Sequence, residues 1–254
     1  MLFFSLFIVL AIPTESRNLC LLLATLSLPF ILLYPSAKRW FKYPQLILSI
    51  CWGFSVLIPW AASESSLDGG GTLLFCWLAT IFWTFGFDTV YAMADEIDDK
   101  VIGLNSSAIS LGKKSIQTVS FCYFLTCLFL ALAAFKANLG LIYWPFWLVS
   151  TLGMQREVIL LNLRSQGIKT SGLHFSNQVR LGSLLLFGMC WHSWKQWFRV
   201  DETAVFVLGG SFHSVFWVYV SYKNIQANEK LIKLEVPRLR QKERPSVGRA
   251  PAGG

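Results

Sequence analysis

The sequence predicts an all-α bundle of helices that crosses a membrane several times, a polytopic membrane protein. Hydrophobic residues make up 54% of its 254 residues and charged residues only 14%, and the mean hydropathy is +0.52. A soluble domain of this length seldom contains so much apolar material. The net charge of +8 lies at the ends of apolar segments and in the C-terminal tail, which favours membrane orientation over nucleic-acid binding.

Short polar or proline-containing connections separate the apolar runs that predict the helices. The first run, residues 1–12, has no basic residue before it, so it is not a signal peptide. It is also shorter than the roughly 20 residues that cross a bilayer, and we expect it to be the end of a longer helix. Pro13, Pro35, Pro44 and the turn at residues 68–71 are expected to separate the runs. The later runs are residues 19–34, 45–62, 72–93, 115–135, 139–163, 181–197 and 204–222.

Lysine and arginine are divided unequally between the two ends of these predicted helices. Alternate connections and the tail, beginning at Tyr34, contain 18 of the 22 basic residues, and the opposite connections contain the other four. By the positive-inside rule, the connections rich in lysine and arginine are cytoplasmic. This places Lys38, Arg39, Lys42 and residues 95–100 on the cytoplasmic face. We therefore expect an integral protein of a bacterial-type inner membrane, with its active face in the cytoplasm.

The acidic residues are concentrated in residues 88–100, which hold five of the fourteen. If the preceding helix continues, Asp88, Asp95 and Asp99 lie on one face, and Asp95 and Asp99 are one turn apart. Two carboxylates at that spacing can share one hard cation. A solvated helix end is the alternative. Uncompensated acids at the C-terminal end of a helix oppose its dipole, so we expect a positive group to be bound there.

A second polar stretch, residues 34–39, is predicted in a loop on the same face. Tyr34 offers a phenol, and Lys38 and Arg39 offer cations that suit a phosphate or diphosphate. Ordinary positive-inside loop charge is the alternative for the two cations. The acidic pair suits Mg²⁺, which usually takes other ligands from substrate phosphates and water. Among the aromatic residues before the acids, Tyr91 is our candidate to face a developing carbocation.

These parts together resemble the UbiA family of intramembrane aromatic prenyltransferases, and within it the 4-hydroxybenzoate polyprenyltransferases. The resemblance covers residues 1 to about 190. Its most specific block is Phe87-Asp-Thr-Val-Tyr-Ala-Met93 followed by Asp95-Glu-Ile-Asp-Asp99. The other matching stretches are Tyr34-Pro-Ser-Ala-Lys-Arg-Trp40, Pro44-Gln45, Cys51-Trp-Gly53, Trp60-Ala-Ala62, Ile81-Phe-Trp-Thr84, Gly103, Ser106, Gly112 and His174-Phe-Ser-Asn-Gln-Val179 with Leu181-Gly182.

The resemblance implies Mg²⁺-dependent transfer of a polyprenyl group from a polyprenyl diphosphate to an aromatic acid acceptor such as 4-hydroxybenzoate, in quinone biosynthesis. Asp95 and Asp99 would hold the metal, with Lys38 and Arg39 beside them as catalytic cations. Substrate binding would involve Tyr34, Lys38, Arg39, Asp88 and Tyr91.

The sequence departs from the family pattern in three places. The family's first aspartate-rich motif has no equivalent in it, Asn105 stands where relatives usually carry a basic residue, and residues 204–222 extend past the usual end. We expect residues 1–222 to form the prenyltransferase-like membrane domain and residues 223–254 a basic, disordered tail. We also expect the chain to need a missing N-terminal half. An inactive or partner-dependent fragment is the first alternative. A transporter is the second, although the acids lie at a helix end and not in mid-span.

Overall fold

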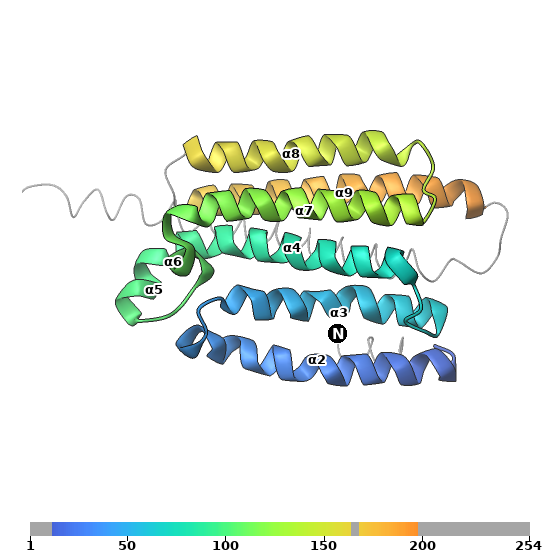
Figure 1. Ribbon diagram of the computed structural model, residues 1–254, viewed down its shortest axis with the longest axis horizontal. Helices are drawn as coiled ribbons and strands as arrows, with labels where there is room; N and C mark the ends of the chain where they lie inside the picture. The colour runs from blue at the N-terminus through green and yellow to red at the C-terminus, as the bar shows by residue number, and fades with distance from the viewer. Residues whose placement is uncertain (1–11, 164–167, 198–254) are drawn as a thin grey trace, which may run out of the picture. The chain divides into compact units, whose positions relative to one another are not determined.

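The computed structural model describes residues 12–163 and 168–197, which form helices and no strand (Figure 1). The all-α fold class is therefore confirmed for this part of the chain. Six long helices alternate with turns, and a short helical segment joins α4 to α7. The elements are α2 (Thr14–Trp40), α3 (Pro44–Glu64), α4 (Gly70–Ala94), α5 (Glu96–Ile102), α6 (Ser107–Leu111), the 3₁₀ turn η1 (Gly112–Lys114), α7 (Ser115–Lys136), α8 (Tyr143–Leu163) and α9 (Ile168–Trp197).

Four of the described helical stretches are long and apolar enough to cross a membrane. They are α2, α3, α4 and the continuous stretch Ser107–Lys136 that ends in α7. The outer face of α2 is apolar and exposed, as a lipid-facing helix must be; its exposed leucines include Leu21, Leu22, Leu26, Leu28 and Leu32. The chain is an integral membrane protein, as its composition predicts.

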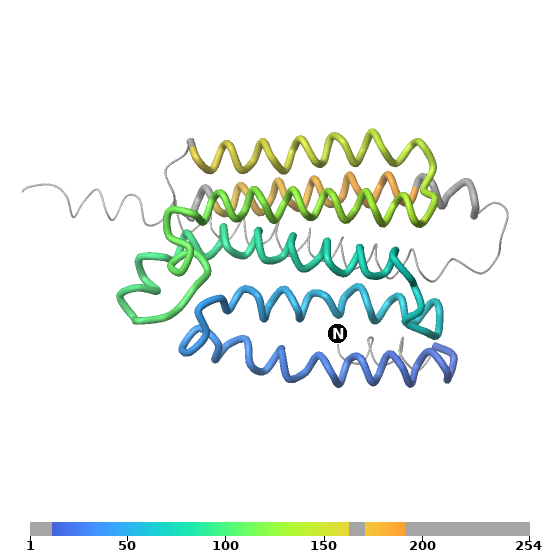
Figure 2. Tube along the Cα trace, viewed as in Figure 1, coloured from blue at the N-terminus to red at the C-terminus, as the bar shows by residue number. Residues whose placement is uncertain are grey.

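Helix α4 occupies the centre of the arrangement. It packs against α3 on one side and against α7 and α9 on the other, while α2 packs on α3 and α8 packs on α7 and α9. Figure 2 traces this path through the chain. The main core lies where α4, α7, α8 and α9 meet and includes Val90, Tyr123, Met154 and Leu185. A smaller cluster of Cys20, Leu23 and Ala61 joins α2 to α3.

Proline marks two of the three helix boundaries that the sequence suggests. Pro13 precedes α2 and Pro44 opens α3, at the position where a missing N–H costs nothing. The prediction that Pro35 ends a helix is wrong, because α2 continues through Pro29 and Pro35 to Trp40. Membrane helices tolerate interior proline, since neighbouring groups satisfy the freed carbonyl. Residues 34–39 are therefore helical and not a loop.

Helix α9 also begins earlier than the apolar pattern indicates. The predicted run starts at residue 181, whereas α9 starts at Ile168 and includes the polar block from His174 to Gln178. The polar side chains in this part of α9 lower its hydropathy, so the apolar pattern does not reveal it. Polar side chains are possible here because they face protein rather than lipid. The predicted first run, the run at 204–222 and the tail from residue 223 lie outside the described residues.

The packing of α4 against α7 depends on Gly86. A Cβ atom built at Gly86 would lie 2.9 Å from Tyr123 Cε1 and 3.2 Å from Cys122 Cβ. Tyr123 is fully buried, so its ring has little room to move away. The absence of a side chain at position 86 is what lets the two helices approach.

Gly86→Ala is therefore expected to lower the free energy of unfolding by about 1–3 kcal/mol, the usual cost of overpacking. Gly172→Ala is the matched control, because a Cβ at Gly172 meets no heavy atom within 4 Å. Denaturant titration of each purified variant in detergent, followed by circular dichroism, measures the difference. Equal stability of the two variants would show that the close approach at Gly86 is unimportant.

Candidate functional site

The acidic stretch lies at a break between two helices. Helix α4 ends at Ala94, Asp95 occupies the junction, and α5 begins at Glu96. The expectation of one continuous helix through Asp88, Asp95 and Asp99 is therefore wrong. Asp99 N still donates to Asp95 O at 2.8 Å, so one helical turn separates these two residues as predicted.

This break reverses the predicted relation between the acids and the helix dipole. Glu96, Asp98 and Asp99 occupy the first turn of α5, where the dipole favours negative charge. The dipole argument for a bound positive group therefore fails for these three residues. A different observation supports positive charge at this place: Lys38 lies against Asp99, the most buried acid of residues 88–100.

The last turns of α2 bring Tyr34 and Lys38 to the acids. The two residues are four apart in one helix and so lie on the same face. Lys38 Nζ lies 3.4 Å from Asp99 Oδ2, and the two side chains are 31% and 9% exposed. The ion pair joins residues 61 positions apart in the chain. Because Asp99 is buried, its charge is screened less by water than that of a surface acid.

Asp88 completes this group from the last third of α4. Its carboxylate lies near enough to Lys38, Asp95 and the phenol of Tyr34 for these groups to act on its charge, and its Oδ2 atom is buried without a hydrogen-bond partner among the described residues. Tyr34 also interacts with the charge of Asp99. We call these five residues, Tyr34, Lys38, Asp88, Asp95 and Asp99, the acidic centre. Three helices contribute to it: α2, α4 and α5.

Two predicted site residues lie apart from this centre. Arg39 is exposed, and the described residues provide no ion pair for it. Tyr91 is 53% exposed on α4; its three-residue offset keeps it near the helix face of Asp88, but the hydrogen bonds and ion pairs of the described residues do not join it to the centre. In this arrangement, neither side chain takes part in the contacts that hold the centre together.

The acidic centre suits a divalent cation that brings some of its own ligands. Asp95 and Asp99 offer carboxylate oxygens one turn apart, which is the donor type that Mg²⁺ prefers. Among the described residues, no group of three or more histidine, cysteine or acidic side chains is placed to hold a metal by itself. A metal at Asp95 and Asp99 would therefore depend on water or substrate oxygens, as Mg²⁺ sites for phosphate compounds usually do.

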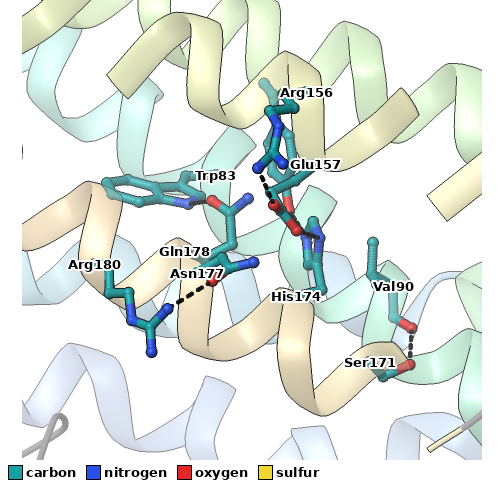
Figure 3. Close-up of polar contacts among 10 residues, drawn as sticks. Trp83, Val90, Arg156, Glu157, Ser171, His174, Asn177, Gln178 and Arg180 are labelled. Atoms are coloured by element: carbon teal, nitrogen blue, oxygen red, sulfur yellow. Dashed lines mark hydrogen bonds and ion pairs between the residues drawn. The ribbon is translucent and has the colours of Figure 1, made fainter. Parts of the chain in front are cut away.

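A second polar group lies in the core where α4, α7, α8 and α9 meet (Figure 3). Tyr123 Oη on α7 and His174 Nε2 on α9 are 2.7 Å apart. Glu157 on α8 lies with Oε2 3.9 Å from His174 Nδ1. Trp83 Nε1 donates to Gln178 Oε1 at 2.9 Å. We call these residues the core polar cluster; Tyr123, Glu157, His174 and Gln178 are each at most 4% exposed.

Sequence reasoning missed most of this cluster. Glu157 lies within an apolar run, and a single acid inside a predicted membrane helix is itself a signal, since buried charge there needs a partner. The spacing of Ser171, His174 and Gln178, which places them on one helical face, is a second signal. Tyr123 carries no such mark, because a tyrosine in an apolar run is also ordinary packing.

Comparison with known proteins places the chain among membrane prenyltransferases. The model of the UbiA prenyltransferase family matches residues 1–177. A 4-hydroxybenzoate solanesyltransferase of Synechocystis sp. is 41% identical over 167 residues, covering 66% of this chain and 56% of that protein. A 4-hydroxybenzoate octaprenyltransferase of Aeromonas hydrophila is 31% identical over 191 residues, covering 73% of this chain and 65% of that protein.

A third relative, a 4-hydroxybenzoate octaprenyltransferase of Cupriavidus necator, is 38% identical over 114 residues, covering 45% of this chain and 38% of that protein. The chain thus spans roughly two fifths to two thirds of the length of these relatives. No solved structure matches the chain.

The core polar cluster yields a stability prediction. Tyr123→Phe leaves His174 Nε2 buried without its partner and should lower the free energy of unfolding by about 1–3 kcal/mol. Tyr143→Phe is the matched control, because Tyr143 is equally buried and its hydroxyl has no hydrogen-bond partner within residues 12–163 and 168–197. Denaturant titration in detergent compares the two. A Tyr123→Phe protein as stable as the Tyr143→Phe protein would contradict the importance of this hydrogen bond.

Proposed function

Because the chain belongs to the UbiA prenyltransferase family, we propose that it contributes the acidic centre of a polyprenyltransferase that acts on an aromatic acid. The donor would be a polyprenyl diphosphate and the acceptor 4-hydroxybenzoate, which the names of its relatives specify for those proteins. The product would be a prenylated aromatic acid of the kind used to make quinones. An inactive or partner-dependent piece of such an enzyme is the alternative.

The observation that carries this proposal is the ion pair between Lys38 and Asp99, which lies one helical turn from Asp95. The sequence keeps these residues about 60 positions apart, and the fold brings the ammonium group of Lys38 to 3.4 Å from Asp99. The negative oxygens of a bound diphosphate need positive charge beside them. Carboxylates can provide that charge only by holding a metal ion. The centre contains both kinds of group at one place, with the phenol of Tyr34 as a hydrogen-bond donor.

In the proposed reaction, the allylic C–O bond breaks and the diphosphate leaves with the electron pair. A new C–C bond forms between the prenyl carbon and the aromatic ring, and the ring then loses a proton. Charge develops on the departing diphosphate, so groups fixed around it lower the barrier. Mg²⁺, when bound, would supply positive charge to that leaving group. Lys38 would supply a second positive charge, and Asp95 and Asp99 would orient the metal.

We also propose that the acidic centre faces the cytoplasm. The connection from α4 to α7, which includes Asp95 and Asp99, contains Lys113 and Lys114 and lies at the same end of the bundle as Lys38 and Lys42. The α3–α4 connection at the other end has no lysine or arginine. The positive-inside rule favours the cytoplasm for the lysine-rich end.

Cysteine labelling in cells tests this orientation in a variant whose six native cysteines are replaced by alanine. Asp98→Cys should react with a membrane-impermeant maleimide only after the cells are opened. Asp68→Cys, which is equally exposed on the α3–α4 connection, should react in intact cells. Labelling of the two positions in the reverse order would contradict the orientation.

A fusion protein tests the proposed reaction, since the chain spans 56% of its Synechocystis relative. The N-terminal part of that relative, up to the point where the matching region begins, is joined to this chain. Turnover of radiolabelled polyprenyl diphosphate with 4-hydroxybenzoate is expected. Asp95→Asn or Asp99→Asn should reduce it by at least about a hundredfold, because amides cannot replace the lost charge on the metal and its diphosphate.

Asp98→Asn is the control for this experiment. Asp98 lies between the two in the same short helix but is exposed, so its loss should leave turnover nearly unchanged. Equal loss in all three variants would indicate a general charge effect and not a metal site. A fusion protein that folds but transfers no prenyl group would favour the inactive fragment.

A further inference from the structure

The short segment after α5 is held in place by hydrogen bonds to three different helices. Helix α5 ends at Gly103, whose φ of 77° is left-handed and suits glycine. The chain then turns back toward the bundle. Asn105 N donates to Lys38 O at 2.6 Å, and Leu104 N donates to Asp99 O at 2.8 Å. These bonds tie the segment to the two residues that form the ion pair of the acidic centre.

Gln45, in the first turn of α3, makes a buried attachment to this segment. Its side chain is buried, with the residue 2% exposed, and Oε1 accepts a hydrogen bond from Ser107 N at 2.7 Å. The two residues are 62 positions apart. Ser107 N is one of the first N–H groups of α6, which have no partner inside that helix. The glutamine therefore supplies the partner that this buried N–H requires.

Ser107 is joined to α4 as well. Its hydroxyl lies 2.8 Å from Thr89 Oγ1, and both residues are 0% exposed. Thr89 directly follows Asp88, a member of the acidic centre. Ser110 Oγ adds a further bond, to Lys42 O at 2.7 Å. The segment from Leu104 to Ser110 thus contacts the end of α2, the start of α3 and the last third of α4.

We propose that Gln45 is a positioning residue of the acidic centre: through Ser107 it holds the α5–α6 segment so that Asp99 stays against Lys38. None of the hydrogen bonds that Gln45 makes among the described residues reaches a member of the centre, so it acts through this segment. Its importance for catalysis rests on the function proposed above, but its effect on the segment does not. Outer groups that orient metal ligands typically change metal affinity by 10- to 100-fold.

Two substitutions at Gln45 separate positioning from general packing. Gln45→Met keeps the length of the side chain and removes the acceptor, which leaves Ser107 N unpaired. Gln45→Glu keeps an acceptor oxygen at the same position and should rescue the segment. Gln155→Met is the matched control, because Gln155 also makes partly buried contacts between helices, accepting from Ser120 Oγ and donating to Ser120 O, but between α7 and α8, which contribute no residue to the centre.

Hydrogen exchange on the purified full chain in detergent is the first measurement. In Gln45→Met, peptides that cover residues 96–110 should exchange about tenfold faster or more. Gln45→Glu and Gln155→Met should leave those peptides at the wild-type rate. Unchanged exchange of residues 96–110 in Gln45→Met would overturn the proposal, whatever the function of the protein.

Metal binding is the second measurement, with Mn²⁺ and inorganic diphosphate as probes and electron paramagnetic resonance as the readout. Gln45→Met should weaken Mn²⁺ binding about tenfold, with recovery in Gln45→Glu. Equal weakening in Gln45→Met and Gln155→Met would overturn the positioning role. If the wild-type chain binds no Mn²⁺, the proposed metal site fails, and the exchange measurement alone decides whether Gln45 positions the segment.

Discussion

The structure depends on the need to satisfy every buried backbone group at the edge of an apolar bundle. Between α4 and α7 the chain leaves regular helix for a break at Asp95, a short α5, a turn at Gly103 and a short α6. Each such change exposes N–H and C=O groups that the interior cannot leave unpaired. Gln45 and Ser106 meet this need with side-chain oxygens, which accept from Ser107 N and Ile109 N. These hydrogen bonds fix the path of the segment between α4 and α7, which carries most of the acidic residues.

Helix α4 contributes to two polar groups of different character. The acidic centre contains formal charges of both signs, and Lys38 is partly open to its surroundings. An ion pair with one partly exposed member can rearrange when a charged ligand binds. The core polar cluster, in contrast, is almost completely buried and links α7, α8 and α9 through Tyr123, Glu157 and His174. Hydrogen bonds between membrane helices stabilise a packing arrangement, and this cluster is suited to that task.

The chain spans only part of the length of the prenyltransferases that it matches. The relatives that match the chain are longer than it, and the chain corresponds to little more than half of the Synechocystis protein. In the proposed function, Lys38 and a metal ion held by Asp95 and Asp99 would offset charge on a bound diphosphate. Because the chain is shorter than these relatives, the tests of activity are built on a fusion protein.

Composition and motif spacing alone determined the membrane class, most helix positions and the candidate residues Tyr34, Lys38, Asp95 and Asp99. These follow from local patterns, since apolar length fixes membrane helices and a four-residue spacing fixes a common face. Tertiary structure decided the rest. It carried α2 through Pro35, broke the helix at Asp95, moved three acids to the start of α5 and paired Asp99 with Lys38. It also buried Gln45 and Glu157 beside partners 62 and 17 residues away in sequence. No local pattern contains these pairings, because each depends on which helices lie side by side.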